Sequence, residues 1–313
     1  MLSDYFLLAF KNVRKRGIRS WLTMLGIFLG IAAVVSLISL GSGLRTAITG
    51  QFASLSTDVL EITSVETGFG PPGATAVRKL TEHDLQIIED SPGVELAIPR
   101  LIRIVRAEFN RITSFVYIGS IPDSQDSIDE IVKSSGIETI EGRFLRAEDR
   151  GKIVLGNDFT KEDVFDKQVR VGNSITVNGQ DFEVIGILKR TSTFTLNSVI
   201  LMPQSDLKDI LDIDDEIDLI TVKVNDENNI ETIAEEIERR MRKDRNQDEG
   251  EEDFSVQTPT QALSSVNTIL NIVNIVVSGI ALIALLIGGI GIANTMFTSV
   301  LERTKEIGVM KAI

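Results

Sequence analysis

The chain has 313 residues, enough for about two domains, and its 45 Asp or Glu against 32 Lys or Arg give a formal net charge of −13. This acidic balance argues against nucleic acid as a partner, because binding to phosphate requires positive charge. The sequence has no cysteine, which excludes disulfide bonds, so a domain outside the cell must be stabilised by its own hydrophobic core.

Charge is unevenly distributed along the chain. Two stretches, 20–44 and 254–301, carry no formal charge, and each is long enough for a spanning helix, which needs about 20 apolar residues. The short flanks, 1–19 and 302–313, hold 8 basic and 3 acidic residues, whereas the remainder holds 24 basic and 42 acidic ones. Because short basic flanks stay in the cytoplasm, we predict a multi-pass protein of the cell membrane with both termini cytoplasmic and residues 51–259 extracytoplasmic.

The N-terminal part is expected to form a surface helix followed by a spanning helix. Residues 1–19 are predicted to be a cytoplasmic interfacial helix, because apolar residues recur at helical spacing and basic residues gather toward its end. Transmembrane helix 1 and its extension are predicted at 20–50. The only tryptophan, Trp21, lies at the predicted cytoplasmic interface, which favours its amphipathic ring. Gly26 and Gly30 form a GxxxG pair that lets another helix approach closely.

The segment 51–259 alternates strand-like and helical patterns, which predicts a large α+β extracytoplasmic domain in one or two lobes. Thr81 is expected to cap a helix that runs to about Glu89, and 229–245 has the periodicity of an amphipathic helix. An Asn-Gly pair at 178–179 predicts a β-hairpin. Strands are predicted at 59–65, 94–99, 102–109, 112–120, 152–156, 174–177, 182–188, 199–202, 219–224 and 254–258.

The second uncharged stretch is too long for a single span. As one helix, residues 260–301 alone would reach about 63 Å at about 1.5 Å per residue, against about 30 Å of bilayer hydrocarbon. Its first part is rich in Gln, Ser, Asn and Thr. Within 260–300 we therefore predict a stalk followed by transmembrane helix 2 at 275–297. Gly288, Gly289 and Gly291 make one part of this helix narrow enough for close packing.

The segment 301–313 mixes charged and apolar residues directly after the last predicted span. This pattern suits a short amphipathic helix that lies partly in the membrane interface. The residues alone leave two interpretations open, a solvated juxtamembrane face and a contact surface for a cytoplasmic protein. The residues that would form this surface are Glu302, Arg303, Lys305, Glu306, Ile307 and Met310.

The composition offers little for an enzyme site. His83 is the only histidine, so a Ser-His-Asp triad or a zinc site would depend on it alone, and we expect an ordinary surface residue. The acidic run from Asp212 to Asp218 lacks the glycine and closing glutamate of an EF-hand loop, and we expect a solvated turn. No GxxxxGK[ST] motif occurs. We therefore predict a non-catalytic subunit with no catalytic, cofactor-binding or metal-binding residues and no cofactor of its own.

Motifs at both ends of the chain are more specific. The sequence reads RSWLTMLGIFLG at 19–30, and GGIGIANTM at 288–296 is followed by ERTKEIGVMKA at 302–312. These motifs resemble the first-span signature and the second-span exit of the MacB/FtsX-like ABC transporter permeases. The middle is similar to the family's MacB-type extracytoplasmic core domain, through LTEHD, PGV, GRF and FEVIGIL in the family's order. The resemblance covers essentially the whole chain.

The resemblance implies a permease subunit of an ABC-type transporter that acts by mechanotransmission. ATP would be bound and hydrolysed on a separate cytoplasmic ABC ATPase subunit. The ATPase would move the long helices of a permease homodimer or related heterodimer in the lipid bilayer. The outer domains would then export or extract a substrate such as a macrolide, a peptide or a lipoprotein. The segment 301–313 would be the exit segment, and its six residues named above would be the ATPase-coupling residues. Because the family's permease has four spans, we expect a sequence that stops at Ile313 to be truncated before the last two.

Two other functions share the predicted topology. A two-span membrane sensor or receptor would carry a ligand-binding domain outside and an output domain after the second span, where 12 residues follow Leu301. A membrane-tethered enzyme would need a cluster of catalytic groups in the outer domain.

Overall fold

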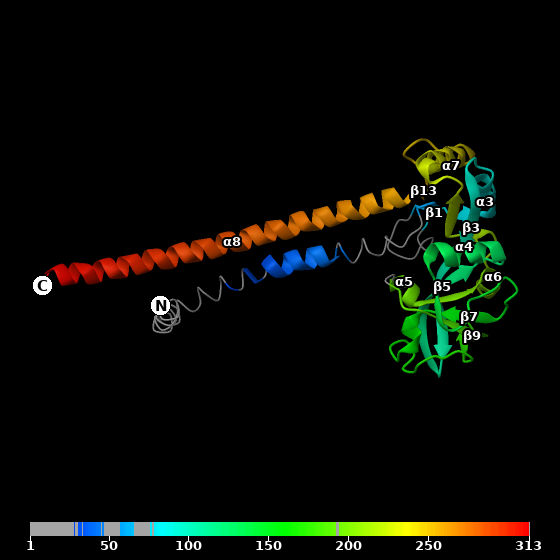
Figure 1. The fold of residues 1–313 in the computed structure, drawn as a ribbon, viewed down its shortest axis with the longest axis horizontal. Coiled ribbons are helices and arrows are strands. Elements are labelled where there is room, and N and C mark those ends of the chain that lie inside the picture. Colours follow the sequence, from blue (N-terminus) through cyan, green and yellow to red (C-terminus); the bar gives the residue numbers. More distant parts are fainter. Residues whose placement is uncertain are drawn as a thin grey trace. The chain divides into compact units, whose positions relative to one another are not determined.

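A computed structural model describes residues 28, 31–32, 34–44, 46, 57–65, 76, 78–191 and 194–312. The chain divides into two compact units. The helical unit contains the helix Val34–Leu44 and the long helix α8 from Ser264 onward, and the α+β unit is Gly50–Leu263 (Figure 1). The predicted interfacial helix at 1–19, together with Trp21, Gly26 and Gly30, lies outside the described residues.

The α+β unit alternates strands and helices, which confirms the predicted α+β class. In chain order the elements are β1 (Val59–Ser64), β2 (Leu80–Thr81), α3 (Glu82–Glu89), β3 (Val94–Arg100), β4 (Ile102–Phe109), β5 (Ile112–Ile121), α4 (Gln125–Ser135), β6 (Thr139–Gly142), β7 (Lys152–Leu155), η1 (Asn157–Thr160), β8 (Ser174–Val177), β9 (Gln180–Leu188), α5 (Phe194–Asn197), β10 (Val199–Pro203), α6 (Gln204–Leu211), β11 (Glu216–Ile217), β12 (Leu219–Val224), η2 (Glu227–Asn229), α7 (Ile230–Arg245), β13 (Phe254–Gln257) and α8 (Pro259–Ala312).

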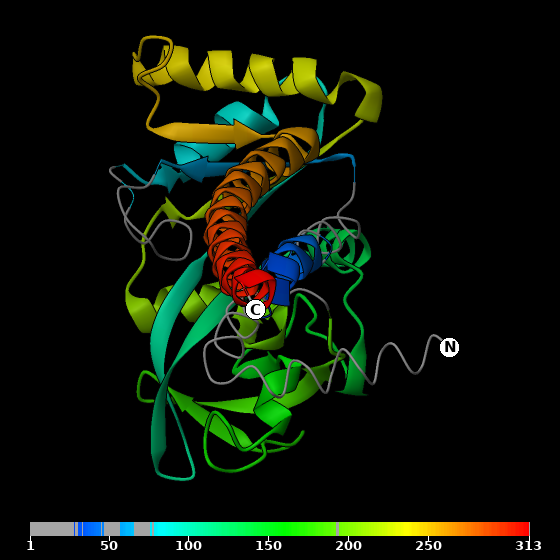
Figure 2. The same ribbon diagram turned by 90° about the vertical axis from the view of Figure 1, so that its left-hand side faces the viewer.

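The first lobe is an antiparallel sheet in the order β13-β1-β12-β3. Its chain order, β1–α3–β3 and then β12–α7–β13, is that of a split βαβ fold. Both helices cover the same face of the sheet (Figure 2). Alternate strand residues face them, because side chains in a strand point to opposite sides in turn. The core on this face includes the predicted apolar stripe of α7, Ile230, Ile233, Ile237 and Met241, packed with Leu60, Ile62, Ile220 and Val222.

The second lobe is inserted between β3 and β12. Its sheet has the order β6-β9-β7-β10-β5-β4-β8, and a further pairing of β9 with β8 closes six of these strands into a barrel. The barrel is filled by apolar side chains that include Phe159, Phe165 and Phe182. The predicted hairpin joins β8 to β9. Asn178 and Gly179 have φ of 50° and 92°, the left-handed conformation that a type I′ turn requires at both positions.

Helices α4 and α6 are not predicted from the sequence pattern. Helix α4 is mostly polar, yet Ile128 and Ile131 are buried in a cluster that also contains Leu96 and Ile98 of β3. Lys223 of β12 adds a charged contact, with Nζ 3.0 Å from Glu130 Oε2. Helix α4 of the second lobe therefore packs on the face of the first sheet that α3 and α7 leave uncovered.

Helix α8 continues from Pro259 to Ala312 without interruption (Figure 1), a length of about 81 Å at about 1.5 Å per residue. The exit segment is therefore the end of this helix and not the separate short helix that we expected. Among the described residues, one helical segment is long and apolar enough to cross a bilayer, Pro259–Ile280, with mean hydropathy 1.6. Within the first uncharged stretch, 20–44, the described residues form only the shorter apolar helix Val34–Leu44. The presence of two spans therefore stays a prediction, as does the position of the second span at 275–297.

Candidate functional site

The predicted coupling residues lie on the last turns of α8. Arg303, Ile307 and Met310 follow one another at spacings of four and three residues, which places them on one face of the helix. Ile307 and Met310 are 56% and 70% exposed, and Arg303 and Lys305 are exposed too. Glu302 and Glu306 belong to the same turns, and their side chains lie outside the described part of the structure. The described side chains form a mixed apolar and basic surface, a composition suited to binding another protein.

The predicted packing glycines of α8 have open surroundings. A Cβ built on Gly288 or Gly289 meets no atom within 4 Å in the described part of the chain. Close packing of a further helix at these glycines and at Gly291 stays a prediction, because no such helix is among the described residues.

A different glycine makes a close helix contact within the helical unit. A Cβ built on Gly41, in the helix Val34–Leu44, would lie 2.8 Å from Asn274 Oδ1 of α8. Gly41 is buried, and Leu270, one turn before Asn274, is 4% exposed. Sequence reasoning missed this contact. The available signal was the glycine-serine run at 41–43, whose partner helix only the structure identifies.

Replacing Gly41 by leucine should therefore weaken the packing between these two helices. A larger side chain must displace Asn274 or the helix itself, and overpacking of this kind costs about 1–3 kcal/mol. Thermal unfolding of the detergent-solubilised chain should show a lowered midpoint. Gly43→Leu is the matched control, because no atom of the described residues lies within 4 Å of a Cβ built on Gly43. Equal midpoints for the two variants would contradict the assignment.

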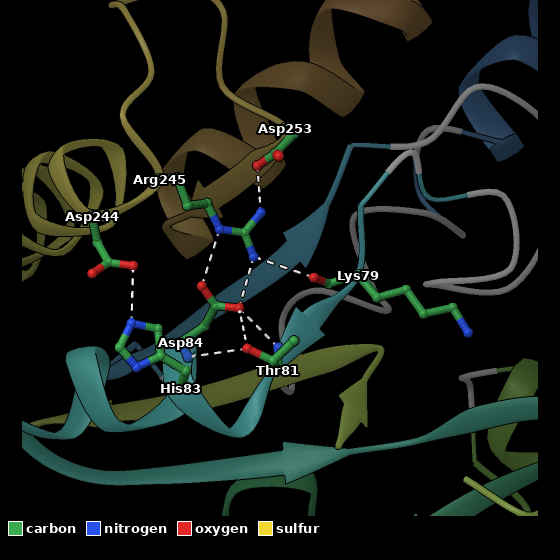
Figure 3. A network of polar contacts seen from close by, with 7 residues as sticks. All are labelled: Lys79, Thr81, His83, Asp84, Asp244, Arg245 and Asp253. Atoms are coloured by element: carbon green, nitrogen blue, oxygen red, sulfur yellow. Dashed lines mark hydrogen bonds and ion pairs between the residues drawn. The ribbon is translucent and has the colours of Figure 1, made fainter. Parts of the chain in front are cut away.

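The α+β unit contains a buried ion network at the junction of α3, α7 and β13 (Figure 3). Arg245 donates through Nε to Asp84 Oδ1 at 3.0 Å and through Nη2 to Asp84 Oδ2 at 2.7 Å. A third donor of Arg245, Nη1, pairs with Asp253. Thr81 caps α3 as predicted, and its backbone N–H donates to Asp84 Oδ2 at 2.8 Å. Every charged member has a partner, which is typical of a stabilising network.

The pKa of Asp84 agrees with a stabilising role for this ion network. Burial raises the pKa of the Asp84 carboxyl, but the hydrogen bonds and charge of Arg245, together with the donors of Thr81, outweigh it and hold that pKa below its usual value. His83 lies beside the network, with Nε2 3.1 Å from Asp244 Oδ2 and a side chain that is 65% exposed (Figure 3). The expectation of a surface histidine is confirmed.

The acidic run from Asp212 to Asp218 is only partly a solvated turn, and our expectation was wrong for its last members. Asp218 is completely buried, accepts the backbone N–H of Ile102 at 2.8 Å and pairs with Arg103. Glu216 pairs with Lys79 and lies 3.1 Å from Arg103. The hydrogen bond from Lys79 is the main cause that holds the pKa of Glu216 below its usual value.

The described residues contain no group of three or more His, Cys, Asp or Glu side chains able to hold a metal ion.

Comparison with known proteins identifies the family of this chain. Residues 20–240 match the family model described as the MacB-like periplasmic core domain. The chain is 32% identical over 313 residues to an uncharacterised ABC transporter permease of Methanocaldococcus jannaschii, covering 100% of this chain and 75% of the relative. The chain belongs to the MacB-like ABC transporter permeases.

Two further likenesses help to place this MacB-like permease. It is 29% identical over 316 residues to the macrolide export ATP-binding/permease protein MacB of Neisseria gonorrhoeae, covering 99% of this chain and 47% of that protein. The fold resembles the crystal structure of the periplasmic region of MacB from Actinobacillus actinomycetemcomitans, with a TM-score of 0.54 at 15% identity over 69% of this chain and 95% of that one. The chain thus spans about half the length of the MacB relative. At this identity the structural likeness shows the fold alone.

Proposed function

We propose that this MacB-like permease couples a separate cytoplasmic ABC ATPase to its α+β unit through displacement of α8. The observation that carries the proposal is the continuity of α8 from the end of β13 through the coupling residues to Ala312. In a helix each backbone N–H bonds to the carbonyl four residues earlier, so an uninterrupted helix resists stretching and bending. A displacement applied at its C-terminal turns would therefore be transmitted along its length.

The first turn of α8 is firmly fixed within the α+β unit, as such a mechanism requires. Thr258 is completely buried, and its Oγ1 accepts the backbone N–H of Gln261 at 3.1 Å. The Gln261 side chain in return accepts the backbone N–H of Thr258 at 3.2 Å, a reciprocal cap. Thr260 Oγ1 donates to Glu231 Oε1 of α7 at 3.0 Å. These contacts support transmission between the helix and the domain that contains α7.

The remaining parts of the proposal follow from the family. We infer a homodimer or related heterodimer in the cell membrane, with both termini cytoplasmic and residues 51–259 outside. ATP would be bound on the partner ATPase, and no cofactor is needed on this chain. The macrolide export protein of Neisseria gonorrhoeae, as a relative, favours export of a small molecule such as a macrolide, and peptides or lipoproteins are the other candidates. Membership in a permease family favours transport over the two-span sensor.

The test is the combined replacement of Glu302, Arg303 and Glu306 by alanine in the full-length subunit. Loss of these charges should reduce co-purification of the ATPase and lower permease-stimulated ATP turnover at least about tenfold, because several charge-assisted contacts are removed together. Unchanged co-purification and turnover would overturn the coupling role.

A matched triple variant in the second lobe is the control. Glu162, Asp163 and Lys167 are exposed in the second lobe, and none has an ion-pair partner among the described residues. Replacing these three by alanine removes the same charges and should leave both readouts unchanged.

A further inference from the structure

The first-lobe sheet has a pocket on the face opposite α3 and α7. Helix α4 covers this face beside β3, and the part near β1 and β13 remains open as a cavity of about 140 Å³. The space is large enough for several waters or a small organic molecule. Its walls come from both lobes and from the first turn of α8. They are largely apolar, through residues such as Val59, Ile131, Leu219 and Pro259.

A carboxylate without a protein partner lies in this pocket. The register of β1 places Glu61 opposite Thr221 of β12 on one side and Gln257 of β13 on the other, so Glu61 is central on the sheet face. Among the described residues, Glu61 makes no hydrogen bond or ion pair. Its side chain is open to the cavity. Glu61 is exposed to the cavity, yet the surrounding atoms displace enough water from its carboxyl group to raise its pKa, and the charge of Arg100 opposes this rise. An ionised carboxylate in such a place favours an occupant that supplies donors.

A guanidinium group faces the same cavity. Arg100, at the end of β3, donates through Nε to the carbonyl of Ser120 at 2.8 Å. Its Nη1 and Nη2 have no acceptor within the described part of the chain. Burial lowers the pKa of Arg100 to about 10, which still leaves it charged at neutral pH. The pocket therefore presents one fixed positive group and one negative group, and among the described residues these are the only charged side chains that line it.

These charges restrict the chemistry of an occupant. A simple cation is repelled by Arg100 and a simple anion by Glu61, because electrostatic complementarity penalises like charges at short range. A zwitterion satisfies both groups, and the apolar walls favour an aliphatic part. We propose that this pocket binds a small aliphatic zwitterion of the α-amino acid class, with its ammonium group toward Glu61 and its carboxylate toward Arg100.

The site adjoins the first turn of α8, through Thr258, Pro259 and Ala262. An effect of the ligand on ATP turnover would rest on the proposed function. Binding itself does not, because it depends only on the α+β unit. A binding measurement can therefore fail while the coupling role stands, and the reverse is also true.

The experiment is calorimetric titration of the full chain in detergent with L-valine. Binding is expected, and isobutylamine and isobutyrate, which each carry one of the two charges, should bind at least about tenfold more weakly because one charged hydrogen-bonding group is lost. No binding of valine would overturn the proposal, since it would leave a pocket filled by water. Equal binding of isobutylamine or isobutyrate would overturn the zwitterion class.

Two variants locate the site. Glu61→Gln should weaken valine binding at least about tenfold, while the neutral amide keeps the fold because Glu61 is exposed and has no partner to lose among the described residues. Ala262→Leu should fill the cavity and block binding without changing either charge. Glu89→Gln is the control, because Glu89 is exposed on α3 and lies outside the pocket. Unaltered affinity in both pocket variants would place the ligand elsewhere and refute the assignment.

Discussion

Replacing Arg245 by alanine should destabilise the α+β unit by about 3–5 kcal/mol, because it leaves buried charge without a partner. The Arg245 side chain is 0% exposed, and its partners Asp84 and Asp253 are 3% and 16% exposed. The variant also loses the contact of the guanidinium with the Phe254 ring, 5.5 Å from its centroid. Chemical unfolding of the chain in detergent, followed by circular dichroism, measures the loss. Arg239→Ala is the control, because Arg239 is 67% exposed and pairs only with neighbouring Glu236 among the described residues.

The pH dependence identifies the cause of this loss. In the native protein the folded-state pKa of Asp84 is depressed, so its ion pair stabilises the fold above the ordinary aspartate pKa of about 3.9 and is lost as pH falls through the folded value. Without Arg245, only the donors of Thr81 oppose the effect of burial, so the pKa of Asp84 rises. Protonation at lower pH then relieves the orphaned charge. The stability deficit of the variant should therefore be smaller at pH 5 than at pH 7. Equal deficits would show that lost packing, and not charge, is responsible.

Replacing Asp218 by alanine should cost about 2–4 kcal/mol, because a buried hydrogen-bonded charge is removed from partners that remain buried. Its carboxylate holds the N–H of Ile102 and pairs with Arg103, which is 17% exposed. Its own N–H donates to the carbonyl of Arg100 at 3.1 Å. Asp218 thus ties together the two chain segments that connect the lobes. Arg103 keeps its contact with Glu216, which limits the loss.

Hydrogen exchange gives a local readout for Asp218→Ala. The amide of Ile102 should exchange faster, whereas amides inside the barrel should change only as far as global stability falls. Asp215→Ala serves as the control from the same acidic run, because Asp215 is exposed and has no partner among the described residues. Unchanged protection of Ile102 would contradict the role of Asp218 at the lobe connection.

Local sequence signals predicted many elements correctly because their causes are local. The cap at Thr81 needs only the next three residues, and the Asn178-Gly179 turn needs two positions that tolerate positive φ. The stripe of α7 follows from helical periodicity alone. Helix α4 was missed because its few apolar residues gain stability from strand β3, which is distant in the sequence.

The candidate sites show the same division between local causes and tertiary causes. The sequence by itself determined the family motifs, the charge pattern and the position of the predicted coupling residues, since these depend on the order and type of neighbouring residues. Only the tertiary structure decided that the exit segment continues α8, that Gly41 contacts Asn274, and that Asp218 and Arg245 are buried. It also brought Glu61 and Arg100 into one pocket. The physical reason is that burial and pairing of a side chain depend on strands and helices that reach it from far along the chain, and no local pattern records which ones do.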